Sequence, residues 1–335
     1  MLRVVEDEKL IRKYAGRFVK SLKRLADEKI RVKLGHQGAS FPAGVLWSKK
    51  LGIWFFSQTT KNVRYANAFG IGKPPEGSHL PITAEINFPA GGIDRRTGGA
   101  FACDPLGNVF AVHRGVIGGG KKGIGKSFFE ESYRGVWSEM EDAGAISQVA
   151  VIGALASGRF PLQAALFIRK IEQLKSTVER SSQTRFDFSQ VAFREDFLGS
   201  PPPPPAEDLS ALCERDLIVR HLASILARWK FKVGNDPQHD LFIMDAFESK
   251  MSHVFAVSAD SKEQNVLAAT AKLLLQAAGA NGKPSAILII PDHVVNRYIQ
   301  DLEKLTVRTF GFRLEEDRII FPDLGKMRLD LNTQL

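Results

Sequence analysis

The sequence predicts an α+β protein of two domains, in which a β-rich N-terminal domain is joined by a polyproline spacer to a C-terminal α/β domain. Three observations support this prediction. The 335 residues exceed what one ordinary domain needs. Short apolar stretches punctuated by turn residues fill the first half, whereas helical periodicity alternates with short apolar runs in the second. Five consecutive prolines, residues 201–205, separate the two patterns.

These patterns place a basic helix and the β-rich domain in residues 1–180. A polar and proline-rich linker follows in residues 181–206, and the α/β domain occupies residues 207–335. Five prolines form an extended, semi-rigid spacer that can join neither a helix nor a central strand. A polyproline ligand for a partner domain is the alternative interpretation of this segment.

The first predicted element is an amphipathic helix over residues 6–29, where apolar residues recur at three- and four-residue spacing. Its other positions carry Arg12, Lys13, Arg17, Lys20, Lys23 and Arg24. Such a row is typical of a solvated helix face, and it could also follow a phosphate backbone.

Alternating apolar residues with turn signals predict the rest of the N-terminal domain. We expect hairpins over residues 44–56 and 100–115, strands over 81–89 and 148–155, and a helix over 160–180. Many short strands of this kind are typical of a barrel or a sandwich-like domain.

After the prolines, the expected order is helix, strand, strand, helix, strand, helix, strand. The helices are predicted over residues 208–230, 262–278 and 292–305. The strands are predicted over residues 240–245, 253–259, 286–291 and 307–312, with a further apolar run at 318–324.

The positive charge is concentrated in the N-terminal part. Residues 1–200 hold 30 Lys and Arg against 19 Asp and Glu, a net charge of +11, so the remainder carries −2 of the total of +9. Basic charge gathered in one domain favours a polyanionic partner, because each neutralised phosphate releases counterions. Nucleic acid, DNA above all, is therefore the expected partner, and an inert basic surface is the alternative.

The sequence lacks features of a membrane or secreted protein. No apolar run has the length that a transmembrane helix needs, and the charged N-terminus is unlike a secretory signal. The two cysteines, Cys103 and Cys213, lie far apart, which argues against a disulfide framework. We therefore expect a soluble protein of a reducing cytoplasm, with no membrane partner.

Three segments of the C-terminal domain carry a family resemblance. They are VGNDPQHDLFIMD, FAVSADSKEQNVLAATAKLLL and SAILIIPDHVVNRYIQDLEKL. Together with the order of elements over residues 207–325, they resemble the PD-(D/E)xK superfamily, the fold of many restriction endonucleases. The resemblance implies phosphodiester hydrolysis assisted by Mg²⁺, which carboxylates from two strands hold and a lysine supports.

The second motif departs from the superfamily pattern. Asp240 stands where the first carboxylate, a metal ligand, is expected, but Ala256 and Ser258 occupy the positions of the second acid and the lysine. Either the catalytic site is degenerate, or its groups have moved to other elements. The candidates for relocated catalytic roles are Glu214, Asp245, Asp260, Glu263 and Lys272.

A glycine- and lysine-rich loop is the second candidate site. Residues 120–127 satisfy the G-x-x-x-x-G-K-[ST] pattern, in which backbone N–H groups and a lysine bind nucleotide phosphates. Asp245 could then supply the Mg²⁺ ligand of a nucleotide-binding switch. Against this, the preceding strand is expected in a hairpin rather than in a buried parallel sheet.

The same region predicts a phosphate-contacting surface for nucleic acid, since glycines allow close approach of the backbone. The expected contacts are His113, Arg114, Lys121, Lys122, Lys126, Arg95, Arg96 and Arg64. An exposed loop without a ligand is the alternative.

We therefore expect a DNA-binding protein of restriction or defence type with a nuclease-like C-terminal domain that is catalytically degenerate. Two alternatives remain open, an active Mg²⁺-dependent endonuclease with relocated groups and a phosphate-loop nucleotide switch. A homodimer is also compatible with the sequence, because many nuclease-like cores pair.

Overall fold

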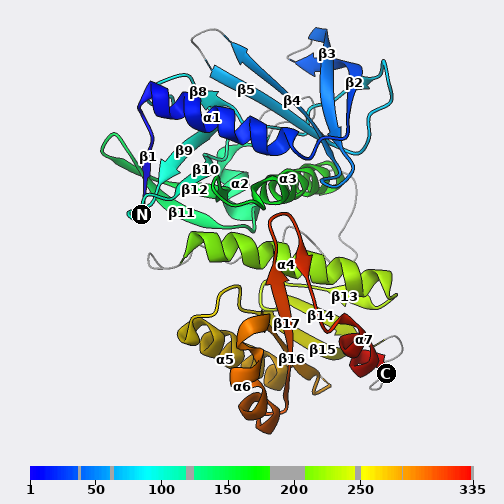
Figure 1. Ribbon diagram of the computed structural model, residues 1–335. Coiled ribbons are helices and arrows are strands. Elements are labelled where there is room, and N and C mark those ends of the chain that lie inside the picture. Colours follow the sequence, from blue (N-terminus) through cyan, green and yellow to red (C-terminus); the bar gives the residue numbers. More distant parts are fainter. Residues whose placement is uncertain are drawn as a thin grey trace. The chain divides into compact units, whose positions relative to one another are not determined.

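The computed structural model describes residues 1–36, 39–60, 64–117, 124–181, 208–245, 250–280 and 282–332. It confirms the mixed α+β class, with helices and strands throughout the described chain (Figure 1). Contacts divide the chain into two compact units. Unit 1 comprises residues 1–185 and 201–213, and unit 2 comprises residues 186–200 and 214–335.

Five strands of unit 1 close into a barrel in the order β1-β11-β12-β10-β9. β1 runs parallel to β11, and the other neighbouring pairs are antiparallel. The strands are β1 (Leu2–Val4), β9 (Gly99–Cys103), β10 (Val109–His113), β11 (Trp137–Asp142) and β12 (Ala145–Ala154). The turn between β9 and β10 is held by Asp104, whose Oδ1 accepts hydrogen bonds from the backbone N–H of Leu106 and Asn108.

A seven-stranded sheet forms the other β layer of unit 1, in the order β6-β2-β3-β4-β5-β7 with β8 paired to β5. Its strands are β2 (Glu28–His36), β3 (Ala39–Ser48), β4 (Ile53–Thr60), β5 (Arg64–Ile71), β6 (His79–Leu80), β7 (Ala84–Glu85) and β8 (Phe88–Pro89). Gly52 adopts φ +66° at the β3–β4 turn, a conformation that favours glycine.

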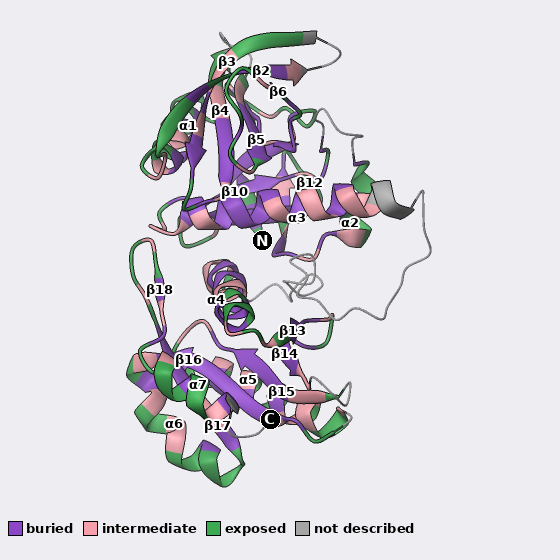
Figure 2. Ribbon diagram, turned by 90° about the vertical axis from the view of Figure 1, so that its right-hand side faces the viewer, coloured by how far each residue is buried: buried purple, intermediate pink, exposed green. Residues whose placement is uncertain are grey.

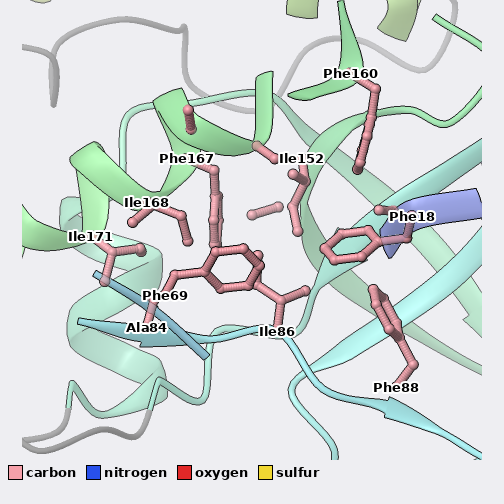
Figure 3. Close-up of a cluster of buried hydrophobic side chains, with 14 of the residues drawn as sticks. Phe18, Phe69, Ala84, Ile86, Phe88, Ile152, Phe160, Phe167, Ile168 and Ile171 are labelled. Atoms are coloured by element: carbon pink, nitrogen blue, oxygen red, sulfur yellow. The ribbon is translucent and has the colours of Figure 1, made fainter. Parts of the chain in front are cut away.

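The described helices of unit 1 are α1 (Glu8–Lys23), α2 (Lys126–Ser132) and α3 (Phe160–Ser181), together with the first five residues of α4. Phe18 of α1 makes edge-on ring contacts with Phe69, Phe88 and Phe160, which joins α1, the sheet and α3 in one core (Figure 3). Asp7 caps α1, because its side chain accepts a hydrogen bond from the Leu10 N–H at 2.8 Å.

Unit 2 is built on a six-stranded sheet in the order β13-β14-β15-β16-β17-β18. The central strands β15 to β17 are parallel, and the outer pairs are antiparallel. The strands are β13 (Lys232–Gly234), β14 (Leu241–Met244), β15 (Met251–Val257), β16 (Ser285–Pro291), β17 (Val307–Leu314) and β18 (Ile319–Ile320). Strands β15 and β16 are largely buried, whereas the helices around them have exposed outer turns (Figure 2).

Helices cover both faces of this sheet. α5 (Glu263–Gly279) and α6 (Asp292–Lys304) pack on the face that includes Val254 and Leu288. α7 (Leu324–Asn332) lies on the opposite face, where Arg308 donates a hydrogen bond to the Asp330 carbonyl at 3.2 Å. α4 (Leu209–Arg228) begins in unit 1 and contributes its remaining turns to unit 2, where its His221 stacks on Phe321.

The structure confirms both predicted hairpins and the helix over residues 160–180. After residue 207 the predicted elements occur in the predicted order, with an additional strand, Lys232–Gly234, between α4 and the first predicted strand and an additional helix, Leu324–Asn332, at the end. The first helix ends at Lys23, earlier than predicted, because residues from Glu28 onward pair with β3. The segment 81–89 forms two short strands rather than one. The five prolines, residues 201–205, lie outside the described residues.

Candidate nucleic-acid interface and the Asp240 centre

After the first turn of α1, every exposed residue except Gly16 is basic. Ile11, Ala15, Phe18 and Leu22 are buried on one side of the helix. The opposite side carries the exposed residues Lys9, Arg12, Lys13, Arg17, Lys20 and Lys23. An α-helix turns by about 100° per residue, so the spacing that places the apolar residues on the buried side of α1 places all of these cations on its solvent-facing side.

Five of these cations have no acidic partner among the residues that the structure describes: Lys9, Lys13, Arg17, Lys20 and Lys23, called the basic face below. Arg12 differs, because it pairs with Glu8 at 2.6 Å and hydrogen-bonds to the Tyr65 side chain, which raises its pKa. Tyr65 follows Arg64 in β5, and successive side chains of a strand point to opposite faces, so the Tyr65 contact does not place the Arg64 side chain on the basic face. Arg64 is exposed, as predicted for a nucleic-acid contact.

His113 is not a surface cation. It is fully buried in β10, where its Nδ1 accepts a hydrogen bond from the Gly115 N–H at 3.1 Å and its Nε2 lies 3.3 Å from the Glu85 carbonyl oxygen. Burial lowers its pKa to about 4, so the imidazole is neutral at pH 7. This corrects the expectation of a phosphate contact, since strand β10 is covered on both sides and its side chains are core residues.

Two predicted arginine contacts turn toward an internal acid. Arg114 is only 10% exposed and pairs with Asp142 at 2.5 Å. Arg95 lies 3.6 Å from the same carboxylate and donates to the Asp142 carbonyl at 2.7 Å. Asp142 is itself buried, so these arginines hold the β11–β12 turn, and its carboxylate balances one of their two positive charges. Arg96 remains exposed in the same loop.

The phosphate-loop pattern lacks its expected surroundings. β10 precedes it and is paired antiparallel on both sides, whereas that motif requires a strand of a parallel sheet. Lys126 starts the seven-residue helix α2, is half-exposed and lies 3.5 Å from Glu130. Lys121, Lys122 and Gly120 lie outside the described residues. Asp245, the proposed Mg²⁺ ligand, belongs to the other unit.

In unit 2, Asp240 is a buried carboxylate that binds two cations. It directly precedes β14, and its Oδ1 accepts hydrogen bonds from Lys272 Nζ of α5 at 2.9 Å and from the Arg215 guanidinium of α4. Its Oδ2 accepts from the Val257 N–H at 3.3 Å. The Asp240 centre, meaning Asp240, Arg215 and Lys272, therefore joins the sheet to helices α4 and α5.

The protonation of Asp240 follows from these contacts. Burial alone acts to raise its pKa, but the charges of Arg215 and Lys272 and the hydrogen bonds outweigh burial, so the pKa is lowered. The carboxylate is therefore ionised at neutral pH and already balanced by internal cations. A divalent ion at the same oxygens would meet two positive charges within hydrogen-bonding distance.

The strand beside Asp240, β15, carries no carboxylate. Leu241 pairs with Phe255, and continuing this antiparallel register places Asp240 opposite Ala256. Ser258 is buried and donates its hydroxyl hydrogen bond to the Asp260 carbonyl at 3.1 Å. The Asp260 carboxylate in turn accepts hydrogen bonds from the Lys262 N–H and the Asn265 side-chain amide. These two hydrogen bonds lie at the N-terminus of α5. The motif positions that the resemblance singles out are thus adjacent to Asp240 but chemically changed.

Among the catalytic candidates, the structure brings together Asp240 and Lys272. Asp245 lies at the far end of β14, roughly 16 Å along the strand. Glu263 is exposed in the first turn of α5, about 13 Å before Lys272 along that helix. Glu214 is buried on α4 beside Arg215. Among the described residues, no group of three His, Cys, Asp or Glu side chains could hold a metal ion.

Arg215 is the member of this centre that sequence reasoning missed. The run Glu214-Arg215-Asp216 carries three consecutive charges at the start of a helix, and all three residues have at most partial exposure. Consecutive charges on a helix point in directions about 100° apart, so they cannot share one solvent-facing side. This run was the available signal for a buried ion pair.

No protein family model, curated protein or solved structure matches the chain. Within the part of the chain that the structure describes, no helix combines the length and the apolar character needed to cross a membrane.

Proposed function

We propose that this protein binds nucleic acid, DNA in particular, through the basic face of α1, and that unit 2 is a nuclease-like fold that does not cut. The observation that carries the proposal is the basic face itself, five exposed cations with no acidic partner in the described chain. A role in restriction or defence is the context that the superfamily resemblance implies, and it belongs to the same proposal.

The dimensions of the basic face suit a phosphate backbone. From Lys9 to Lys23 the helix rises about 21 Å, which equals the rise of about six base pairs of duplex. Lysine and arginine heads on flexible stems can reach phosphates on either side of the helix axis. Release of condensed counterions then supplies the driving force, and sequence is not read by these contacts.

The Asp240 centre supports the non-cutting half of the proposal. Metal-assisted hydrolysis needs carboxylates that are free to hold a hard cation. Asp240 is instead paired with Arg215 and Lys272, and the opposing strand offers Ala256. The same ion pairs that stabilise unit 2 therefore occupy the place where catalysis would begin.

Fluorescence anisotropy with a short labelled duplex tests the binding half. The variant Lys13→Gln/Arg17→Gln/Lys20→Gln is compared with Lys304→Gln/Arg318→Gln/Lys326→Gln, which removes the same net charge from exposed positions of unit 2. We expect the first variant to bind at least about tenfold more weakly at low salt. Its plot of log K against log salt should flatten by about 2.7, since each phosphate contact contributes about 0.9.

The control variant should retain both the affinity and the slope. Equal losses in the two variants would assign binding to overall charge rather than to α1, and no affinity of the unmodified chain for any polynucleotide would end the proposal. Single-stranded DNA and RNA as competitors determine which polymer is preferred.

Incubation of plasmid DNA with the protein and Mg²⁺ tests the non-cutting half. We expect no cleavage by the unmodified chain. Cleavage that disappears in Asp240→Asn would instead establish the alternative, an active endonuclease that uses Asp240.

A further inference from the structure

The outer face of α5 is apolar although it is exposed. Leu275 is 76% exposed and Leu267 is 53% exposed. The exposed positions around them form what we call the α5 outer face: Gln264, Leu267, Ala268, Ala271, Leu275 and Ala278. Two charged residues border this face: Lys272, whose charge is paired with Asp240, and Glu263, which lies eight residues before Ala271. Exposed apolar groups gathered on one face mark an interaction site.

The spacing of this face is symmetric about Ala271. Leu267 lies four residues before it and Leu275 four residues after it, while Gln264 and Ala278 lie seven residues before and after. Two copies of α5 that cross antiparallel on a two-fold axis at Ala271 therefore bring Leu267 of one against Leu275 of the other, twice. A two-fold interface requires exactly such a self-complementary patch.

We propose that the α5 outer face is the interface between two copies of this chain. Charge favours a second copy as the occupant, because identical surfaces that face each other repel wherever they carry net charge. The chain as a whole has a net charge of +9, yet the charge without an ion pair in the described chain at the border of this face is Glu263, and the two copies of Glu263 lie about 24 Å apart in the two-fold arrangement. The proposal does not depend on nucleic-acid binding.

Shape favours the same occupant. The small side chain of Ala271 at the crossing point lets the two helix axes approach to about 10 Å. Hollows lie on both sides of the C-terminal half of α5. One of about 680 Å³ is lined by Leu275 and Gln276, and one of about 1100 Å³ is lined by Leu274 and Ala278. Leu275 is thus a ridge between hollows, which allows the leucines of two copies to interdigitate.

A single pair of helices buries less than the roughly 1,200 Å² of standard stable interfaces. The dimer should therefore dissociate on dilution in the micromolar range. Sedimentation velocity of the full chain over a concentration series measures this equilibrium. We expect Leu275→Glu to weaken dimerisation at least tenfold, because it buries two carboxylates near the axis.

Leu329→Glu is the matched control, since Leu329 is 68% exposed on α7, outside the α5 outer face. It should dimerise like the unmodified chain. Sedimentation of the unmodified chain as a monomer at every concentration overturns the proposal, and so does a Leu275→Glu variant that dimerises as strongly as the control.

A cysteine at the axis tests the geometry independently. With helix axes about 10 Å apart and Cα atoms about 2.3 Å from each axis, the Cα atoms of two Ala271→Cys residues lie about 5.4 Å apart, which is within disulfide range. Mild oxidation should cross-link most of this variant as a covalent dimer, whereas Leu329→Cys should stay monomeric on a denaturing gel. Cross-linking that is equal in the two variants, or absent from both, contradicts a two-fold axis at Ala271.

Discussion

On α1, five lysine and arginine side chains face solvent with no acidic partner in the described chain, whereas at Asp240 two cations turn inward onto one buried carboxylate. The chemical groups are the same, but their surroundings differ. On α1 the ammonium and guanidinium heads keep their hydration and repel one another. At Asp240, Arg215 is 17% exposed and exchanges much of its hydration for contact with the carboxylate.

This difference separates stability from recognition. A buried ion pair holds elements together because removing one partner leaves the other charge desolvated. An exposed row of like charges adds no such stability, and its positive potential remains available to an anionic partner. The two regions should therefore respond in opposite ways to loss of charge.

The largest expected effect is on unit 2. Asp240→Asn keeps the size of the side chain but removes the charge that balances Arg215 and Lys272. We expect the free energy of unfolding to fall by about 4 kcal/mol, as for other buried pairs that lose one partner. Urea denaturation followed by circular dichroism measures it.

Asp301→Asn is the control for this substitution. Asp301 is 79% exposed and pairs with Lys304, so its loss should change the free energy of unfolding by less than about 1 kcal/mol. Similar small effects of the two substitutions would show that the Asp240 centre does not stabilise the fold, and the contrast with α1 would disappear.

A second effect concerns acid and unit 1. Burial lowers the pKa of His113 from 6.5 to about 4, so the unfolded chain binds the proton more readily than the folded chain does between these values. The contribution of neutral His113 to the free energy of unfolding is complete above pH 6.5, and it is lost as the pH falls from 6.5 toward 4. The loss amounts to about 3 kcal/mol, at 1.36 kcal/mol per pKa unit.

Comparison of the unmodified chain with His113→Gln at pH 7 and pH 4.5 isolates this contribution. Glutamine retains one donor and one acceptor, and the variant should lose less stability on acidification. His253 of unit 2, whose pKa burial also lowers to about 4, titrates in the same window but is common to both proteins. Asp240, with its lowered pKa, loses its contribution only at more acidic pH. Parallel pH profiles of the two proteins would contradict the assignment.

The sequence predicts the elements of this fold better than it predicts the surroundings of single side chains. Periodicity identified the buried stripe of α1 and the alternation of helices and strands after residue 207, because burial of apolar faces is a local pattern. β13 and α7 were missed, since a three-residue edge strand and a helix with mixed polarity carry little periodic signal.

The site residues show the same limit. The sequence singles out Asp240 and Lys272, but Asp240 pairs with Arg215 and Lys272 across 25 and 32 positions through tertiary packing. The position of His113 and Arg114 before a glycine- and lysine-rich loop predicts surface cations. Whether a strand is covered on both sides, as β10 is, depends on elements distant in sequence.

A smaller effect is expected for Lys272→Met. The Lys272 side chain is 42% exposed, so its ammonium group retains part of its hydration in the folded chain. When Lys272 is replaced, Asp240 still pairs with Arg215. We expect a decrease of about 1 kcal/mol in the free energy of unfolding. The control Lys304→Met removes the exposed ion pair between Lys304 and Asp301, and it should change the free energy of unfolding by less than half as much.

Combining Lys272→Met with Asp240→Asn refines this prediction. Because the two residues contact each other, the double variant should be more stable than the sum of the single effects predicts. Strict additivity would mean that the 2.9 Å contact between Lys272 and Asp240 contributes nothing.

The smallest expected effect on stability is that of the α1 variant Lys13→Gln/Arg17→Gln/Lys20→Gln. Lys9, Lys13 and Arg17 follow one another at four-residue spacing, which places like charges next to each other on the helix surface. Their repulsion is destabilising by a few tenths of a kcal/mol per pair, so neutralisation should leave the free energy of unfolding unchanged or raise it by up to about 0.5 kcal/mol. Urea denaturation at low salt measures the change.

If this variant loses nucleic-acid affinity while gaining stability, the basic face is retained at the expense of the fold, which is the behaviour of a binding surface. A loss of more than about 1 kcal/mol would instead make these cations structural, as those at Asp240 are.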